Sequence, residues 1–304
     1  MGKSGLVHIK TITEFHRLAG LPKPQHPLIS VIDYSTLNLK EVSGNVILEC
    51  YSIALKKGMN YELRYGQNKY DFDEGVMIFT APNQVIKVER MEMAGSKASG
   101  WILFIHPDFL WNTVLARGIN KYEYFNYSVH EALFLSDKEE TIINNLIENI
   151  QQEYNNNIDK FSQHIILSQI ETLLNYADRF YQRQFITRKI ANHQILERLE
   201  TLLNNYFAGD NLINDGTPTV QYIANSLNIS ASYLGSLLKT LTGQSTQQLI
   251  HEKLIEKAKE KLSTTTLSIS EIAFQLGFEH SQSFSKLFKS KTALSPLRFR
   301  QLFN

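Results

Sequence analysis

The last ninety residues of this 304-residue chain contain two copies of one unit. Residues 223–229 (IANSLNI) match 272–278 (IAFQLGF), and residues 237–245 (LLKTLTGQS) match 287–295 (LFKSKTALS). The offset is 49 in the first pair and 50 in the second, so the two copies keep nearly the same internal spacing. Because each copy must form a similar local structure, this repeat constrains the fold more than any other feature.

Each copy has the residue types of a helix-turn-helix. Ala224 and Ala273 are small residues in the first helix, as required where a second helix crosses closely. Four positions later stand Asn228 and Gly277, which accept a positive φ where the chain turns sharply. Residues suited to cap the second helix follow the turn, namely Ser230 in the first copy and His280 or Ser281 in the second.

A helix of residues 246–262 is predicted between the two copies, with Ser245 and Gln248 as its capping pair. At 1.5 Å per residue it spans about 25 Å. This length is suited to hold two reading helices near the ~34 Å separation of successive major-groove faces. Two more helix starts are indicated by the capping pair Ser268 and Glu271 and by the Ser295-Pro296 dipeptide.

The C-terminal residues 193–304 resemble the AraC/XylS family of bacterial transcription regulators. The resemblance depends mainly on 272–278, on Phe284-x-x-Leu287-Phe288-Lys289, and on Thr292-Ala293-Leu294-Ser295-Pro296-x-x-Phe299-Arg300. It implies a seven-helix, double helix-turn-helix domain that binds double-stranded DNA, behind a cupin-like sensor and dimerisation domain. RNA polymerase and a small-molecule effector are further partners that it suggests.

Two residues depart from the family pattern. Ala293 stands where the family usually has Gly, which suggests a turn geometry that tolerates a Cβ atom. Leu254 stands where Arg is usual, which removes one charge from the helix between the two copies.

The family layout places one face of each second helix against base edges. Carried over position by position, the candidate DNA-binding residues are Ser232, Gly235, Ser236 and Lys239 in the first unit, and Ser281, Gln282, Ser283, Ser285, Lys286 and Lys289 in the second. Gln282 is suited to an adenine edge and Lys286 to guanine or a phosphate, whereas serines discriminate little. We therefore expect base choice to depend on the second unit and on DNA shape. The alternative for Lys239, Lys286, Lys289 and Arg300 is a solvated surface charge.

Charge is divided unevenly along the chain. Residues 217–304 contain 10 Lys or Arg and 5 Asp or Glu, a net charge of +5, whereas residues 1–216 contain 21 and 25, a net charge of −4. A basic C-terminal end is compatible with nucleic-acid binding. With 43% apolar residues the chain is too apolar for a disordered protein.

The N-terminal part alternates short apolar runs with turn residues, which predicts a β-barrel or sandwich. The expected strands are residues 28–34, 45–55, 61–65, 76–79, 84–90 and 100–106. Aromatic residues are dense there, and they either line a small-molecule pocket or simply pack in the core. They are Tyr51, Tyr61, Tyr65, Tyr70, Phe72, Phe79 and Trp101.

Helical periodicity begins after Ser136, which forms a capping pair with Glu139. A second helix, residues 159–183, repeats apolar residues at alternating spacings of four and three, which is a short heptad pattern. They are Ile166, Ile170, Leu173, Ala177 and Phe180. This stripe either packs on its own domain or forms a two-helix dimer contact. Residues 184–194 are predicted to form a linker, and a third amphipathic helix then carries Ile195 to Tyr206.

Few features support an enzyme. The lone cysteine, Cys50, excludes an intramolecular disulfide and a cysteine-cluster metal site, and no histidine lies between His26 and His106, where a metal cupin needs its ligands. Neither a nucleophile motif nor a phosphate loop is present. We therefore expect no enzymatic activity, no metal and no cofactor. Without an apolar membrane-spanning segment or a signal peptide, a cytoplasmic location follows.

We therefore predict an α+β chain in three parts: a cupin-like sensor domain (1–130) in the form of a β-barrel, a helical linker or dimerisation segment (131–184), and a double helix-turn-helix domain (190–304). The predicted function is a dimeric, sequence-specific transcription regulator. The alternatives are a cupin-type small-molecule or carbohydrate-binding protein or enzyme with an appended helical domain, and an adaptor that has lost DNA binding.

Overall fold

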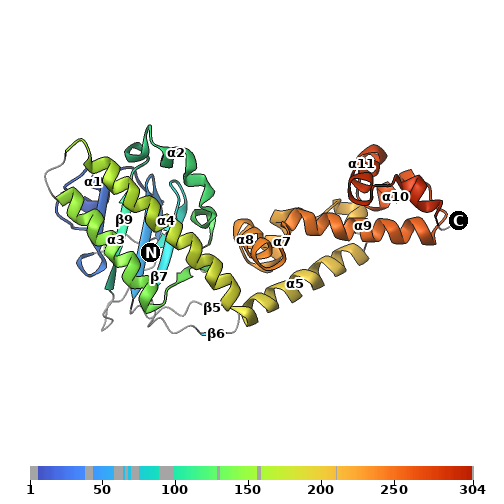
Figure 1. Ribbon diagram of the computed structural model, residues 1–304, viewed down its shortest axis with the longest axis horizontal. Coiled ribbons are helices and arrows are strands. Elements are labelled where there is room, and N and C mark those ends of the chain that lie inside the picture. The colour runs from blue at the N-terminus through green and yellow to red at the C-terminus, as the bar shows by residue number, and fades with distance from the viewer. Residues whose placement is uncertain are drawn as a thin grey trace. The chain divides into compact units, whose positions relative to one another are not determined.

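The protein is described by a computed structural model and folds into two compact units, residues 1–184 and 185–304 (Figure 1). The described residues are 6–37, 44–57, 64–65, 68–69, 75–88, 99–128, 131–155, 159–209 and 211–302. None of the helices within these ranges is long and apolar enough to cross a membrane.

The N-terminal unit contains two main sheets. The smaller one has the order β1-β3-β8, and the larger one has the antiparallel order β10-β7-β4-β9-β2. Their strands are β1 (Val7–Ile9), β3 (Gly44–Leu48), β8 (Val85–Val88), β10 (Leu133–Phe134), β7 (Val76–Thr80), β4 (Tyr51–Lys57), β9 (Ser99–Ile105) and β2 (Ile29–Asp33). A two-stranded ribbon pairs β5 (Arg64–Tyr65) with β6 (Asn68–Lys69).

The two main sheets share a core. Val46 of β3 and Ala54 and Phe104 of the larger sheet belong to one buried cluster, which α1 (Ile12–Leu18) completes with Phe15. The rings of Phe15 and Phe104 lie 4.5 Å apart. The cluster therefore fills the space between the sheets, as in a sandwich.

The opposite face of the larger sheet is covered by α3 (Asp137–Asn155) and α4 (Ser162–Thr187) (Figure 1). The Trp101 indole of β9 donates to Asn144 of α3 at 2.9 Å, and the Lys57 ammonium lies 2.6 Å from the Glu140 carboxylate. The sheet is thus buried on both faces, which explains why its strands contain continuous apolar runs.

The cupin-like closed barrel that the sequence predicted is not found in the described residues. The edge strands of the larger sheet, β2 and β10, do not pair with each other, and the smaller sheet is separate. The predicted strand 45–55 is divided into β3 and β4, which belong to different sheets. Of the predicted strand 61–65 only Arg64–Tyr65 is described, and 84–90 is reduced to Val85–Val88.

The heptad pattern of α4 is explained by packing within the chain. Its five apolar residues are all buried, with exposed fractions between 0% and 5%: Ile166, Ile170, Leu173, Ala177 and Phe180. Of the two alternatives, packing on its own domain is therefore correct for this stripe, and a two-helix dimer contact is not. Of the candidate pocket aromatics, Tyr51 and Phe79 both contact the ring of Phe125, and Trp101 is buried. Three others lie outside the described residues: Tyr61, Tyr70 and Phe72.

Short helical segments connect β9 to β10: η3 (Pro107–Leu110), α2 (Val114–Gly118), η4 (Ile119–Lys121) and η5 (Glu123–Asn126). Another, η1 (Tyr34–Thr36), follows β2. Tyr124 of η5 donates to the Leu174 carbonyl of α4 at 2.7 Å, which fixes this connection to the helical layer.

The C-terminal unit is all helical. After the last turn of α4, its helices are α5 (Lys189–Ala208), α6 (Asn211–Asp215), α7 (Val220–Leu227), α8 (Ala231–Thr242), α9 (Thr246–Thr264), α10 (Ile269–Gln275), α11 (Ser281–Thr292) and α12 (Pro296–Arg300). The segment 184–194, predicted as a linker, contains the boundary between the two units but is helical, because only Arg188 separates α4 from α5.

Candidate nucleic-acid interface

The first helix-turn-helix consists of α7 and α8. Asn228 ends α7 in the left-handed conformation with φ of 58°, and the Ile229 amide then donates to the Ala224 carbonyl at 3.0 Å. Ser230 caps α8 by accepting from the Tyr233 amide at 3.1 Å. Ala224 is fully buried where the helices meet. The predicted turn and cap are therefore confirmed.

The second helix-turn-helix repeats this arrangement with α10 and α11. Gly277 has φ of 80°, and the Phe278 amide donates to the Ala273 carbonyl at 3.0 Å. Of the two cap candidates, His280 takes the N-cap position of α11, although its side chain makes no capping hydrogen bond. Its carbonyl instead accepts from the Ser283 amide at 3.1 Å.

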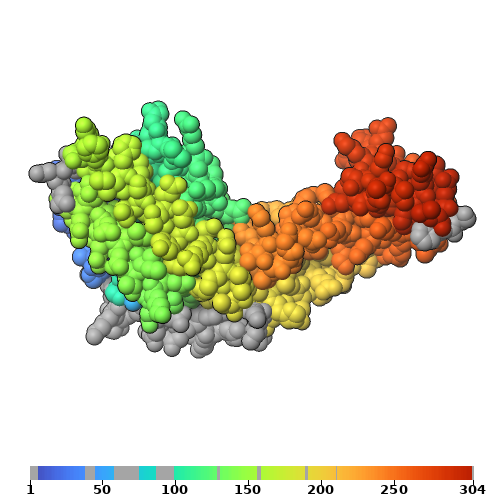
Figure 2. All heavy atoms as spheres, in the orientation of Figure 1, coloured from blue at the N-terminus to red at the C-terminus, as the bar shows by residue number. Residues whose placement is uncertain are grey.

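Helix α9 joins the two helix-turn-helix units, which lie near its opposite ends (Figures 1 and 2). The predicted capping pair is confirmed, since the Gln248 amide donates to Ser245 Oγ at 3.2 Å and Gln248 Oε1 accepts from the Ser245 amide at 2.8 Å. Leu254 is 2% exposed. The residue that departs from the family pattern in α9 therefore packs in the core.

Both second helices have a buried inner face. Leu234, Leu237 and Leu238 are buried in α8, and Phe284 and Phe288 are buried in α11. The ten candidate DNA-binding residues are all exposed or half-buried: Ser232, Gly235, Ser236, Lys239, Ser281, Gln282, Ser283, Ser285, Lys286 and Lys289. Their side chains are thus accessible to a ligand, while their contact with DNA stays a prediction.

The two outer faces differ in charge. Helix α11 has three exposed lysines, Lys286, Lys289 and Lys291, whereas α8 has only Lys239. Burial, and secondly the charge of Lys291, lowers the pKa of His251 on α9, so this histidine adds little positive charge at neutral pH. The positive charge therefore concentrates on the second helix-turn-helix unit.

Arg300 is not a free surface charge. Its Nε donates to the Leu262 carbonyl at the end of α9 with a length of 3.4 Å, and the residue is half-buried. This arginine joins α12 to the end of α9, so the structure does not show the solvated surface charge that was the alternative for it.

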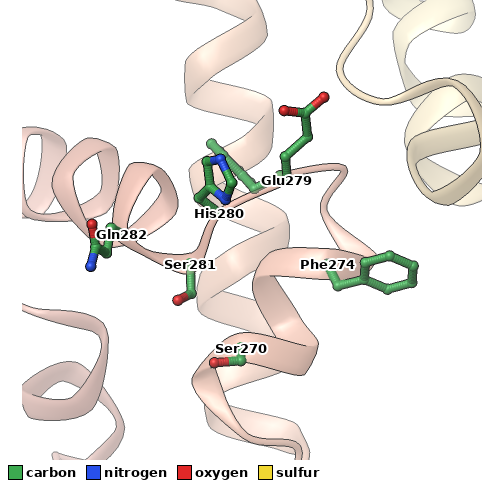
Figure 3. Close-up of a pocket in the computed structure, with 7 residues that line it drawn as sticks. Ser270, Phe274, Glu279, His280, Ser281 and Gln282 are labelled. Atoms are coloured by element: carbon green, nitrogen blue, oxygen red, sulfur yellow. The ribbon is translucent and has the colours of Figure 1, made fainter.

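A shallow depression of about 590 Å³ lies where α10 meets the start of α11 (Figure 3). Gln282 and Phe274 lie at its opposite ends, with Ser270 and Ser281 between them. Phe274 is 62% exposed, and sequence reasoning did not single it out. The repeat contains a signal for it, because Phe274 matches the exposed, polar Asn225 of the first copy.

The geometry at Ala293 corrects one expectation. Ala293 follows α11 with φ of 61°, and Gly243 follows α8 at the equivalent position with φ of 73°. Both residues are therefore left-handed. The second copy does not use a different turn that suits a Cβ atom; it places alanine in a conformation that costs an L-residue about 1–2 kcal/mol.

Comparisons with known proteins agree with the repeat. Residues 223–302 match the protein family described as a helix-turn-helix domain. The raffinose operon transcriptional regulatory protein RafR of Pediococcus pentosaceus is 39% identical over 83 residues, which are 27% of this chain and 30% of that protein. The uncharacterized HTH-type transcriptional regulator YfiF of Bacillus subtilis is 32% identical over 146 residues, or 48% of this chain and 43% of that protein.

Among solved structures, the C-terminal domain of AraT, a response regulator from Geobacillus stearothermophilus, is 30% identical and covers 36% of this chain and 84% of that chain, with a TM-score of 0.32. The chain spans between 30% and 55% of the length of the curated relatives RafR, the Msm operon regulatory protein of Streptococcus mutans, and an HTH-type regulator of Pseudoalteromonas carrageenovora.

Two helix-turn-helix units joined by one long helix define a double helix-turn-helix domain. The order of these helices, the motifs of the repeat and the matched relatives make this C-terminal domain similar to the DNA-binding domains of AraC/XylS-family regulators.

Proposed function

We propose that the protein is a sequence-specific, DNA-binding transcription regulator that reads two adjacent major-groove segments with α8 and α11. The observation that carries the proposal is the pair of accessible helix faces, each placed after a sharp turn, with α9 between the two helix-turn-helix units. An α-helix fits the major groove, and two helices on one chain fit neighbouring segments. The operon regulators among the relatives support the same function.

We also propose that the two reading helices contribute unequally. Gln282 and Lys286 on α11 offer an amide and a cation to base edges, whereas Ser232, Gly235 and Ser236 on α8 offer only small groups. A bidentate contact of an amide to adenine gives about 1–3 kcal/mol of discrimination, and a serine gives less. The first unit then contributes mainly docking and sensitivity to DNA shape.

The remaining partners are part of the same proposal. RNA polymerase is the partner expected of a regulator bound next to a promoter. A second copy of the chain is expected, and the buried stripe of α4 means that other surfaces would join the copies. Exposed apolar residues of the N-terminal unit that are suited to this role include Trp111, Val114, Phe161 and Ile165. A small effector is expected in the same unit.

Selection of bound sequences from random double-stranded DNA by the full-length protein tests the central claim. We expect a motif with two conserved segments about one helical turn apart, and an affinity that falls steeply with salt because phosphate contacts release counterions. Enrichment of no motif, together with binding that does not change with salt, would contradict DNA recognition.

The unequal roles are tested with Gln282→Ala and Lys286→Ala, measured on the selected operator and on base-substituted operators. Gln282→Ala is expected to cost about 1–3 kcal/mol on the matched sequence and to relax choice at one position. Lys138→Ala in α3 removes the same charge as Lys286→Ala from the N-terminal unit and serves as its control. An equal loss on every sequence would mean that the substituted residue does not read bases.

A further inference from the structure

The end of α4 is held by the helix that follows it. Helix α4 ends at Thr187, and α5 begins at Lys189 after a single residue, Arg188, with φ of −83° and ψ of 50°. The last carbonyls of a helix have no partner within it. One of them, on Phe185, accepts a hydrogen bond from the Asn192 side chain, which is 3% exposed.

The ring of Phe185 contacts the first reading helix. Phe185 and Tyr233 of α8 are each only 2% exposed, and their ring centroids lie 5.1 Å apart at an interplanar angle of 67°. Such an edge-to-face pair is attractive beyond the apolar area that it buries. Phe185 therefore contacts two helices, α5 through its carbonyl and α8 through its ring.

The repeat shows that this contact is peculiar to the first copy. At the offset of 50, Tyr233 corresponds to Ser283 of α11, which is exposed and is a candidate DNA-binding residue. The neighbouring pair Leu234 and Phe284 is buried in both copies, so the helices present the same inner face. The first copy thus has a buried aromatic contact where the second has an accessible polar side chain.

We propose that Phe185 is a positioning residue for DNA reading by α8. Tyr233 is the direct neighbour of Ser232 and lies within one turn of Gly235 and Ser236, so a shift of its ring moves the whole outer face of α8. Through Phe185 the last turn of α4 fixes that face, and α11 has no such restraint at Ser283. This inference rests on the proposed function.

The test uses the full-length protein and its selected operator, intact or with one of its two segments scrambled. The segment read by α11 is assigned by its sensitivity to Lys286→Ala. We expect Phe185→Ala to weaken binding to the intact operator about tenfold and to show no further loss when the α8 segment is scrambled. Val85→Ala, which shortens an exposed apolar side chain in the N-terminal unit, is the control and is expected to bind like the wild type.

A second measurement separates positioning from general loss of structure. Amide hydrogen exchange of Phe185→Ala is expected to show lower protection in residues 231–242 and unchanged protection in residues 281–292. Tyr233→Phe keeps the ring pair and is expected to bind within about twofold of the wild type, whereas Tyr233→Ser, which copies the second unit, is expected to behave like Phe185→Ala.

Two results would overturn the inference: equal weakening at both operator segments, or binding by Phe185→Ala that matches the wild type. A uniform loss of protection throughout residues 185–302 would likewise assign Phe185 to the core alone. If the wild-type protein selects no DNA at all, the proposed function itself fails, which is a different result from a wild type that binds and a variant that binds equally well.

Discussion

Adding a methyl group at Gly277 is expected to destabilise the C-terminal unit more than adding a methyl group at any other turn of the repeat. A Cβ atom at this position would lie 2.6 Å from the Leu212 carbonyl oxygen and 2.9 Å from two backbone atoms of Gly216. At Gly243, which has nearly the same φ, a Cβ atom would meet nothing within 4 Å. The two glycines therefore separate the cost of conformation from the cost of close approach.

The magnitudes follow from these two costs. A left-handed alanine costs about 1–2 kcal/mol, and the more restricted unfolded chain returns about 0.4–1 kcal/mol, so Gly243→Ala is expected to cost about 1 kcal/mol. Gly277→Ala adds an overlap with backbone that cannot rotate away, and overpacking of this kind costs about 1–3 kcal/mol. We expect a total near 3 kcal/mol for Gly277→Ala, or a fall in Tm of about 10 °C for a unit of this size.

Urea unfolding of the full-length variants measures the difference. Both tryptophans, Trp101 and Trp111, lie in the N-terminal unit, so their fluorescence reports that unit and serves as an internal control. Circular dichroism also reports the helices of the C-terminal unit. We expect Gly277→Ala to shift the helical transition and to leave the tryptophan transition in place. Equal shifts for Gly243→Ala and Gly277→Ala would refute the argument from close approach.

Three further outcomes follow from the same structure. Ala293→Gly relieves a left-handed alanine and is expected to stabilise the C-terminal unit by about 0.5–1 kcal/mol, seen as a later helical transition in urea. Burial, and secondly the charge of Glu49, raises the pKa of Cys50 to about 12, so a thiol reagent at pH 8 is expected to label the folded protein far more slowly than the urea-unfolded chain. Glu279→Gln removes an exposed negative charge from the depression that Gln282 also lines and is expected to tighten DNA binding several-fold at low salt, with the gain disappearing at high salt. Unchanged unfolding would contradict the Ala293→Gly prediction, and equal labelling rates would contradict the Cys50 prediction. Unchanged affinity would contradict the Glu279→Gln prediction.

The helix-turn-helix pairs were predictable from the sequence because their signals are local. Caps such as Ser230 and Ser245 bond to amides three residues ahead, and a left-handed residue such as Asn228 acts on its own turn. Each of these interactions depends on a few consecutive residues, so residue type and spacing were sufficient. The same signals occur twice in the repeat, which made the prediction stronger.

The N-terminal architecture was less predictable because it depends on distant partners. The run from Asn45 to Leu55 gives no local sign that it divides between two sheets, since strands buried on both faces lack alternation. The helical structure of the segment predicted as a linker was missed for a related reason. Its polar residues hid two buried ones, Phe185 and Asn192, whose hydrogen bond joins the end of α4 to α5.

The two copies of the repeat differ most where another part of the chain packs against them. Asn228 and Gly277 occupy equivalent turns, and a positive φ alone permits either residue. At the second turn, however, the Leu212 carbonyl and the Gly216 backbone lie close to Gly277. Tyr233 and Ser283 differ in the same way, because only the first helix receives the ring of Phe185. Departures between the copies therefore mark the contacts that each copy makes outside itself. On this reasoning, the different outer faces of α8 and α11 are expected to read two different stretches of DNA.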